Sequence, residues 1–372
     1  MVAFLEGCGL DVWWDEALVA RGAWKPQLYR ELAEAAVVVV LWTKEAVDSD
    51  WVKLEADYAS APGRNMIVHV VDHGLKAADL PDPYKTVQYH RPDETGLILR
   101  DVLATRAGHL LLQFKREALP VDGVLPTMLL QAKYGVVPFI DSEGALADTV
   151  DWALAEGVHA TSPRRAAGRL VHGPGGLGKT RLLIEVAEAL RQRGWSAGFI
   201  ARPEAKDTAD ERKRYAEALR YLIRDANDNG LLLVMDYAEG RPDEVARLCD
   251  QIRNRPPEVT RTIRLVLLTR GAGDWWTRLR DENPAVATLF RPEAGVSAVI
   301  AIQDMTSARQ RLELFWSAFR EFAAILPDND YPTPPHNMDA TRLQRIETGE
   351  GYERPLAIQM EALLYLAAAT PG

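Results

Sequence analysis

The sequence predicts an α/β protein built from parallel sheets with covering helices. Apolar runs of strand length alternate with helical patterns at the start of the chain and again after residue 169, and this alternation is typical of parallel sheets. A glycine-rich loop, Gly173–Thr180, separates one apolar run from one helix. Helical patterns dominate beyond residue 300. We therefore expect a sheet domain over 1–105, a connector with helices over 106–168, an α/β/α domain over 169–300 and a helical lid over 301–372.

The composition is that of a globular, acidic protein. The 372 residues carry a formal net charge of −9, which argues against a general nucleic-acid coat. The two cysteines, Cys8 and Cys249, have no metal-binding spacing and suggest a reducing compartment. The longest apolar run, Ala35–Trp42, is too short to cross a membrane, and no basic leader precedes it. We expect a cytoplasmic protein with no membrane or nucleic-acid partner.

The first domain alternates strand and helix patterns. The run Val37–Thr43 is almost wholly β-branched, so we expect a strand that is buried on both faces of a parallel sheet. Ser49 can cap the helix that follows. The expected strands are 9–14, 37–43, 65–72 and 85–90, and the expected helices are 24–36 and 50–60.

This part of the chain resembles a Toll/interleukin-1 receptor (TIR) domain of bacterial type. The matching features are the strand end Val12–Asp15, the loop with Gly22 and Trp24, the Val37–Thr43 strand, and the pattern from Ser49 to Glu55. The resemblance implies a flavodoxin-like parallel sheet. A complete domain of this family starts with an earlier central strand, so we expect the sheet to lack its first strand.

Many bacterial TIR domains cleave NAD⁺ at the nicotinamide–ribose bond, and the resemblance assigns Glu55 as the catalytic glutamate. The transition state has oxocarbenium character, and a carboxylate near the developing positive charge lowers the barrier electrostatically. Trp51 and Glu55 lie four residues apart, hence on one helix face. The alternative is that Trp51 packs against the sheet and Glu55 is a solvated helix residue.

The glycine-rich loop has the arrangement of a phosphate-binding P-loop. Glycines let successive N–H groups converge on phosphate oxygens, and the helix that follows adds its positive end. Lys179 can reach the β- and γ-phosphates, and the Thr180 hydroxyl can ligate Mg²⁺. A glycine turn with an exposed lysine is the alternative. The nucleotide-binding residues expected here are Gly173, Pro174, Gly175, Gly176, Leu177, Gly178, Lys179 and Thr180.

Acidic residues follow a later apolar run, Gly230–Asp236. A buried strand that ends in a carboxylate after a P-loop is a Walker B signature, so Asp236 can hold Mg²⁺. Glu239 lies three residues on and can polarise the attacking water, although it can equally be a surface acid ahead of Pro242. Arg270 closes the next strand run, and it can also be a surface arginine or pair with one of these acids.

The second half resembles the signal transduction ATPases with numerous domains (STAND). That resemblance implies that the Val137–Phe139 turn lies near adenine, that Arg270 reads the γ-phosphate and that Pro355 touches the base. The chain departs from the family at Asp141–Glu143 and at Glu353, and a plain linker is the alternative for the turn. Such proteins usually continue into a repeat sensor, which we expect to be absent here.

Further elements are expected from periodicity alone. They are strands over 195–200 and 264–269, a solvated charged stretch over 207–214, and helices over 108–119, 145–156, 181–193, 216–225, 307–326, 339–347 and 356–369.

Together the resemblances imply a nucleotide-switched signalling protein of prokaryotic antiphage defence. ADP would hold the chain closed, and exchange to ATP after an unknown trigger would let the NTPase and TIR domains self-associate and degrade NAD⁺. A non-catalytic TIR adaptor with a regulatory ATPase is the alternative. No guanine-recognition motif is visible, which favours ATP. We also see no basic helix-turn-helix, the motif that a transcription regulator would need.

Overall fold

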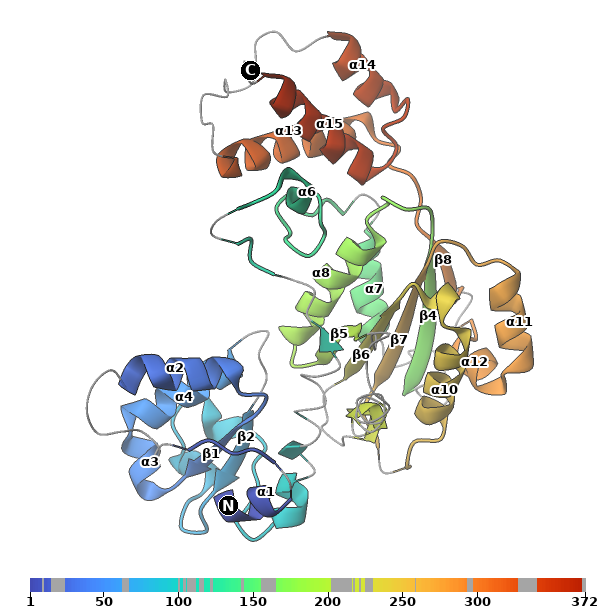
Figure 1. The fold of residues 1–372 in the computed structure, drawn as a ribbon. Coiled ribbons are helices and arrows are strands. Elements are labelled where there is room, and N and C mark those ends of the chain that lie inside the picture. The colour runs from blue at the N-terminus through green and yellow to red at the C-terminus, as the bar shows by residue number, and fades with distance from the viewer. Residues whose placement is uncertain are drawn as a thin grey trace. The chain divides into compact units, whose positions relative to one another are not determined.

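The computed structural model forms two compact units (Figure 1). The first unit comprises residues 1–113, 201–227 and 256–259, and the second comprises 114–200, 228–255 and 260–372. The structure describes residues 1–8, 10–14, 24–61, 67–99, 101–102, 105, 112–113, 117–120, 123–141, 144–154, 165–201, 216, 218–220, 222–224, 230–257, 259–292, 297–326 and 340–369.

The first unit is built on a parallel strand pair. Strand β1 pairs with β2 in the register Val38↔Ile67 to Trp42↔Val71. Ser49 Oγ accepts a hydrogen bond from Val52 N, so the expected cap is confirmed. The elements are α1 (Val2–Gly7), α2 (Trp24–Glu34), β1 (Val38–Trp42), α3 (Lys44–Asp48), α4 (Asp50–Ser60), β2 (Ile67–Val71), η2 (Ala77–Asp79), η3 (Tyr84–Thr86) and β3 (Leu112–Gln113).

Buried aromatic side chains hold this unit together. Trp42 on β1 donates from Nε1 to Nδ1 of His69 on β2 at 3.0 Å. The Tyr84 ring lies 5.3 Å from both of these rings, and its hydroxyl donates to Asp57 Oδ1 on α4 at 2.6 Å. Helix α4 is therefore fixed to the strand pair by packing and by one strong hydrogen bond.

Three expectations for this unit are wrong. Residues 10–14 form no strand, because a strand needs a neighbour to pair with and they join no ladder. Leu41 is exposed, so β1 is not buried on both faces as expected. Residues 85–90 give a 3₁₀ turn and one isolated bridge, Val70↔His90, instead of a strand.

The second unit contains a parallel sheet in the order β5-β6-β7-β4-β8. Every neighbouring pair in this order is parallel, as the apolar runs predict. The strands are β4 (Ala166–His172), β5 (Ser196–Ile200), β6 (Leu231–Asp236), β7 (Ile263–Thr269) and β8 (Val299–Ala301).

Helices cover both faces of this sheet (Figure 1). One layer packs on the sheet through a core that includes Leu183, Phe199 and Val266. On the other side a Cβ atom at Gly168 of β4 would lie 2.6 Å from Cζ of Phe290, so only glycine lets this ring approach. The layers are α7 (Ala145–Leu154) and α8 (Lys179–Arg191), and α10 (Pro242–Arg253), α11 (Asp274–Glu282) and α12 (Pro284–Leu289).

A helical subdomain completes the unit. Its core joins Phe315 and Ile358 to Leu129 and Val137 of the connector. Arg311 is buried and its guanidinium donates to carbonyl oxygens at both ends of this subdomain. These oxygens belong to Met305, Thr306, Ile346 and Glu347. The helices are α6 (Pro126–Leu129), α13 (Ala308–Ile325), α14 (Ala340–Thr348) and α15 (Pro355–Ala369).

Some predictions in this half are wrong or lie outside the described residues. The expected helix over 108–119 is contradicted by strand β3. The stretch 207–214 lies outside the described residues, as do parts of 216–225 and Ser142–Glu143. The described helices include none that combines the length and apolar character needed to cross a membrane.

Candidate functional site

The second unit holds a cavity of about 290 Å³ at the carboxyl ends of its strands. The P-loop forms one wall. The ends of β6 and β7 form another, and the connector turn 136–141 and the start of α15 close the remainder. This is where open parallel sheets bind ligands, because loops from several strands meet at that edge. The cavity gathers most of the residues that the sequence singled out.

The loop Gly173–Thr180 leads from buried strand β4 into helix α8. Gly178 has φ of 86° and is the residue that precedes the helix. An L side chain is strained in that conformation, whereas glycine adopts it freely. The loop thereby turns its backbone toward the cavity at the positive end of α8.

Lys179 lies inside the curve of this loop. Its Nζ donates to the carbonyl oxygens of Gly173 at 2.5 Å and Pro174 at 2.8 Å. Burial lowers the pKa of Lys179, and the charge of Arg270 acts in the same direction, while Asp236 and Glu239 act against it. The ammonium is therefore held by neutral carbonyl acceptors. An anionic phosphate would be a stronger partner and would displace them.

Thr180 and Asp236 meet across the loop. The Thr180 hydroxyl donates to Asp236 Oδ2 at 3.2 Å, while Oδ1 accepts from Tyr237 N. Mg²⁺ prefers one or two protein oxygens completed by water and phosphate, and this pair fits that set. Within the ranges described, no group of three or more His, Cys, Asp or Glu side chains could hold a metal alone.

Glu239 and Arg270 are brought to the same edge. Glu239 Oε1 accepts from the backbone N of Arg270 at 3.2 Å. Glu239 Oε2 is buried, and no described residue donates to it. The Arg270 guanidinium lies 6.0 Å from the ring centroid of Tyr237. The sequence left open whether Arg270 pairs with Asp236 or with Glu239. In the structure Glu239 contacts the backbone N of Arg270.

The lid meets the P-loop through the start of α15. Pro355 lines the cavity, and Leu356 N donates to Gly176 O at 3.2 Å. A Cβ atom at Gly176, whose φ is 86°, would lie 3.2 Å from the Leu356 Cβ. The loop and the lid are therefore in close contact.

The polar residues of the cavity that the sequence analysis did not identify include Thr269 and Asp141. Thr269 at the end of β7 lines it with a buried hydroxyl that has no partner in the described ranges. Asp141 lines it from the connector turn, and its Oδ2 accepts from Leu146 N in the first turn of α7 at 3.2 Å. The departure of Asp141 from the STAND pattern was the signal available for the second residue.

Glu55 lies in the middle of α4 in the first unit. Its side chain is half-buried, whereas Trp51, one turn earlier, is 41% exposed. Trp51 is thus partly exposed on the helix face that also carries Glu55. The hydrogen bond from Tyr84 to Asp57 fixes the helix that carries both residues.

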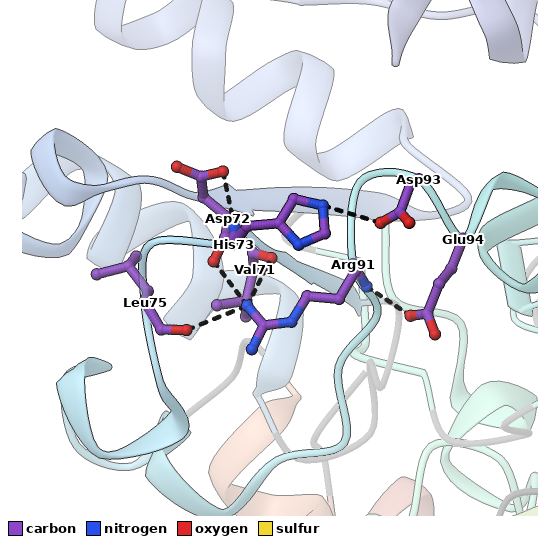
Figure 2. Close-up of polar contacts among 7 residues, drawn as sticks. All are labelled: Val71, Asp72, His73, Leu75, Arg91, Asp93 and Glu94. Atoms are coloured by element: carbon purple, nitrogen blue, oxygen red, sulfur yellow. Dashed lines mark hydrogen bonds and ion pairs between the residues drawn. The ribbon is translucent and has the colours of Figure 1, made fainter.

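The carboxyl end of β2 is held by Arg91 (Figure 2). Its Nη1 donates to the carbonyl oxygens of Val71 at 3.2 Å, Asp72 at 2.6 Å and Leu75 at 3.1 Å. Its backbone N donates to Glu94 at 2.6 Å. One arginine thus orders the loop that follows β2, at the sheet edge where ligands of parallel sheets bind.

Comparison with family models places one known domain in the chain. Residues 1–97 match the family model of the TIR domain. No curated protein sequence matches the chain.

Several solved structures are similar to it. The ORC2 protein of Aeropyrum pernix in its ADPNP–ADP complexes has 13% identity and a TM-score of 0.39 over 64% of this chain and 65% of that one. PCH-2 of C. elegans has 16% identity and a TM-score of 0.39, over 68% of this chain and 72% of that one. Cdc6p of Pyrobaculum aerophilum has 16% identity and a TM-score of 0.35, over 67% of this chain and 65% of that one. The chain thus spans just under two thirds of the ORC2 protein.

The loop geometry of the second unit does not depend on these likenesses. Strand β4, the glycine loop and α8 follow one another, and Asp236 ends the strand two places away in the sheet. Residues 1–97 thus match the TIR domain, and the second unit has the strand–loop–helix arrangement of a P-loop.

Proposed function

We propose that this chain is a nucleotide-switched signalling protein of the STAND type that acts in antiphage defence. The second unit would bind ATP or ADP with Mg²⁺, and the bound nucleotide would control clustering of TIR domains that hydrolyse NAD⁺ at the nicotinamide–ribose bond. The observation that carries the proposal is the convergence of Lys179, Asp236 and Arg270 on one cavity, with Glu239 bonded to the backbone of Arg270, in a chain that also has a TIR domain.

The P-loop backbone and Lys179 would bind the phosphates. On binding, Lys179 exchanges the carbonyl oxygens of Gly173 and Pro174 for phosphate oxygens. Thr180 and Asp236 would hold Mg²⁺, which neutralises charge on the β- and γ-phosphates when bound.

Glu239 suits the task of orienting the attacking water. The contact with Arg270 N fixes one carboxylate oxygen, and Oε2 has no donor from a described residue. A buried acceptor in this state gains a hydrogen bond when water enters. Arg270 would contact the γ-phosphate, which distinguishes ATP from ADP.

The position of the lid would differ between the ATP-bound and the ADP-bound state. Leu356 touches Gly176 of the P-loop, so a phosphate that shifts this loop also shifts the start of α15. A ligand changes the balance of two arrangements only by binding one of them better. The γ-phosphate is the group that supplies this difference here.

In the TIR domain Glu55 would interact with the ribose of NAD⁺ and stabilise the cation that forms as nicotinamide leaves. Its half-buried position lowers competition from water. TIR clustering would complete the substrate site between copies.

A non-catalytic adaptor is the second candidate. The observation that favours it is the exposure of Trp14 and Trp51, which are 43% and 41% exposed. Exposed tryptophans are enriched in protein–protein contacts, and an adaptor needs such contacts without chemistry.

NAD⁺ consumption by the protein with Mg-ATP tests the proposal. We expect the wild type to consume NAD⁺, and Glu55→Gln and Lys179→Ala each to abolish consumption. Glu34→Gln, an exposed glutamate on α2, serves as the matched control and leaves it unchanged. Consumption that survives Glu55→Gln contradicts the role of Glu55. ATP binding without NAD⁺ loss in any variant supports the adaptor.

A further inference from the structure

One turn beside the nucleotide cavity has a strained backbone. Among the non-glycine residues that the structure describes, Tyr237 alone has a positive φ, 55°. This left-handed conformation is costly for a tyrosine, because its Cβ crowds the following carbonyl oxygen. Such conformations persist where the surrounding structure enforces them, and they are concentrated at functional sites. The surroundings of Tyr237 must therefore compensate for this strain.

Hydrogen bonds on both sides of Tyr237 enforce the turn. Tyr237 N donates to Asp236 Oδ1 at 3.0 Å, and Tyr237 O accepts from Gly240 N at 3.2 Å. The chain thereby leaves strand β6 and enters a 3₁₀ turn. That turn carries Glu239 to the backbone N of Arg270, where the carboxylate accepts a hydrogen bond at 3.2 Å. The strained residue thus fixes where the chain after β6 meets the end of β7.

The Tyr237 side chain lies at the surface of the cavity and not in the core. It is 57% exposed, and it lines the cavity together with Arg270. The guanidinium carbon of Arg270 lies over the tyrosine ring, 6.0 Å from its centroid, which is within the range of a cation–π interaction. Because more than half of the side chain is in solvent, core packing does not account for the strained turn.

Another cation lies within electrostatic reach of Arg270. Burial is the main cause of the lowered pKa of Lys179, and the charge of Arg270 lowers it further, so the two side chains repel each other. Ordering a long, exposed arginine also costs conformational entropy. Attraction to the ring face offsets part of the repulsion and restricts the arginine side chain before a ligand arrives.

We propose that Tyr237 is a positioning residue, which holds Arg270 ready for the γ-phosphate and so strengthens binding of ATP relative to ADP. The inference rests on the proposed nucleotide function of the cavity. One turn holds Arg270 twice, at its backbone through Glu239 and at its guanidinium through the ring. A guanidinium that stacks on a ring keeps the N–H groups in its plane available to an anion. Contacts that need no rearrangement on binding retain more of their binding free energy.

Nucleotide binding to the full chain, measured by calorimetry with Mg²⁺, tests this role. The measured quantity is the dissociation constant of ADP divided by that of a non-hydrolysable ATP analogue. Tyr237→Leu should lower this ratio about two- to fivefold, as for one exposed cation–π contact, and should leave the affinity for ADP unchanged. Tyr237→Phe keeps the ring and should retain the wild-type ratio. Tyr29→Leu, at an exposed tyrosine of the first unit, is the matched control and should also retain it.

Two further variants separate positioning of Arg270 from a structural role. In an Arg270→Met background, Tyr237→Leu should have no further effect on the ratio, because the ring then has no cation to hold. Tyr237→Asn removes the ring but suits the left-handed backbone. It should lower the ratio as Tyr237→Leu does, without lowering the melting temperature.

The outcomes distinguish this inference from the proposed function. An unchanged or raised ratio in Tyr237→Leu overturns the role of Tyr237 and leaves the nucleotide site standing. An equal loss of ADP and ATP binding has the same meaning, because a merely structural residue would cause it. An effect of Tyr237→Leu that persists in Arg270→Met also overturns the role. If the wild type binds neither nucleotide, the nucleotide site itself is overturned and this inference with it.

Discussion

His69 makes the stability of the TIR domain depend on pH. The side chain is 6% exposed and accepts a hydrogen bond from Trp42 at Nδ1. Burial lowers the pKa of His69 from 6.5 to about 4. Protonation would place a charge in the core and remove the acceptor that Trp42 uses, so the folded domain keeps the imidazole neutral.

The sign follows from comparing the folded and unfolded chains. Above pH 6.5 His69 is neutral in both the folded and the unfolded chain, and its contribution to the free energy of unfolding is fully present. As pH falls toward 4 the unfolded chain gains a proton that the folded chain does not bind, so unfolding becomes easier. With these two pKa values, the loss at pH 5 relative to pH 7 is about 2 kcal/mol.

The assay is an NMR titration of the histidine ring signals in the full chain, joined to urea unfolding at pH 7 and pH 5. We expect the His69 signal to stay constant down to about pH 5. His69→Gln should lose about 2 kcal/mol less on acidification than the wild type. His73→Gln replaces an exposed histidine and should behave as the wild type. A His69 midpoint near 6.5 refutes the reasoning.

Three further substitutions test contacts described above. Arg311→Met leaves buried carbonyl oxygens without donors and should destabilise the lid by about 3 kcal/mol or more, measured by calorimetric melting. Gly168→Ala drives a methyl group into the Phe290 ring and should cost about 1–3 kcal/mol in urea unfolding, whereas Gly271→Ala meets open space. Arg91→Met should speed hydrogen exchange after β2 by about tenfold or more, since it removes three bonds to carbonyl oxygens.

Each of these three predictions has an outcome that would contradict it. Arg320→Met, an exposed arginine on α13, should leave the melting temperature of the lid unchanged, and an equal effect of the two arginines would contradict the role given to Arg311. Equal costs for the two glycine variants would show that the Phe290 ring moves aside freely. Unchanged exchange in Arg91→Met would mean that the loop after β2 is ordered by other contacts.

The P-loop was predictable because its parts are consecutive in the chain. Glycines, a lysine and a threonine between a strand and a helix carry their own geometry. Asp236 and Arg270 were predictable for a related reason, since the carboxyl ends of neighbouring parallel strands meet at one edge. Their elements β6 and β7 start and end within one residue of the expected strands.

The failures concern features that depend on distant partners. Residues 10–14 have strand composition but join no ladder, and residues 85–90 reach β2 through a single bridge. Helix α11 was not expected because its pattern is mostly polar, and its burial depends on Trp276 packing against Phe290.

The hydrogen bonding of Asp141 is equally invisible in sequence. Its significance comes from one oxygen that binds Leu146 and another that faces no described donor. Sequence periodicity carries no information on either. The same holds for Thr269, whose hydroxyl became notable only when the cavity was located.

The contact between Leu356 and Gly176 has a kinetic consequence. Because the first turn of α15 contacts the loop that would hold the phosphates, breaking this contact would speed release of the proposed nucleotide. The off-rate would then depend on opening of the lid as well as on the strength of the phosphate contacts. Substitutions on the lid outside the cavity would in that case change the off-rate without touching the ligand.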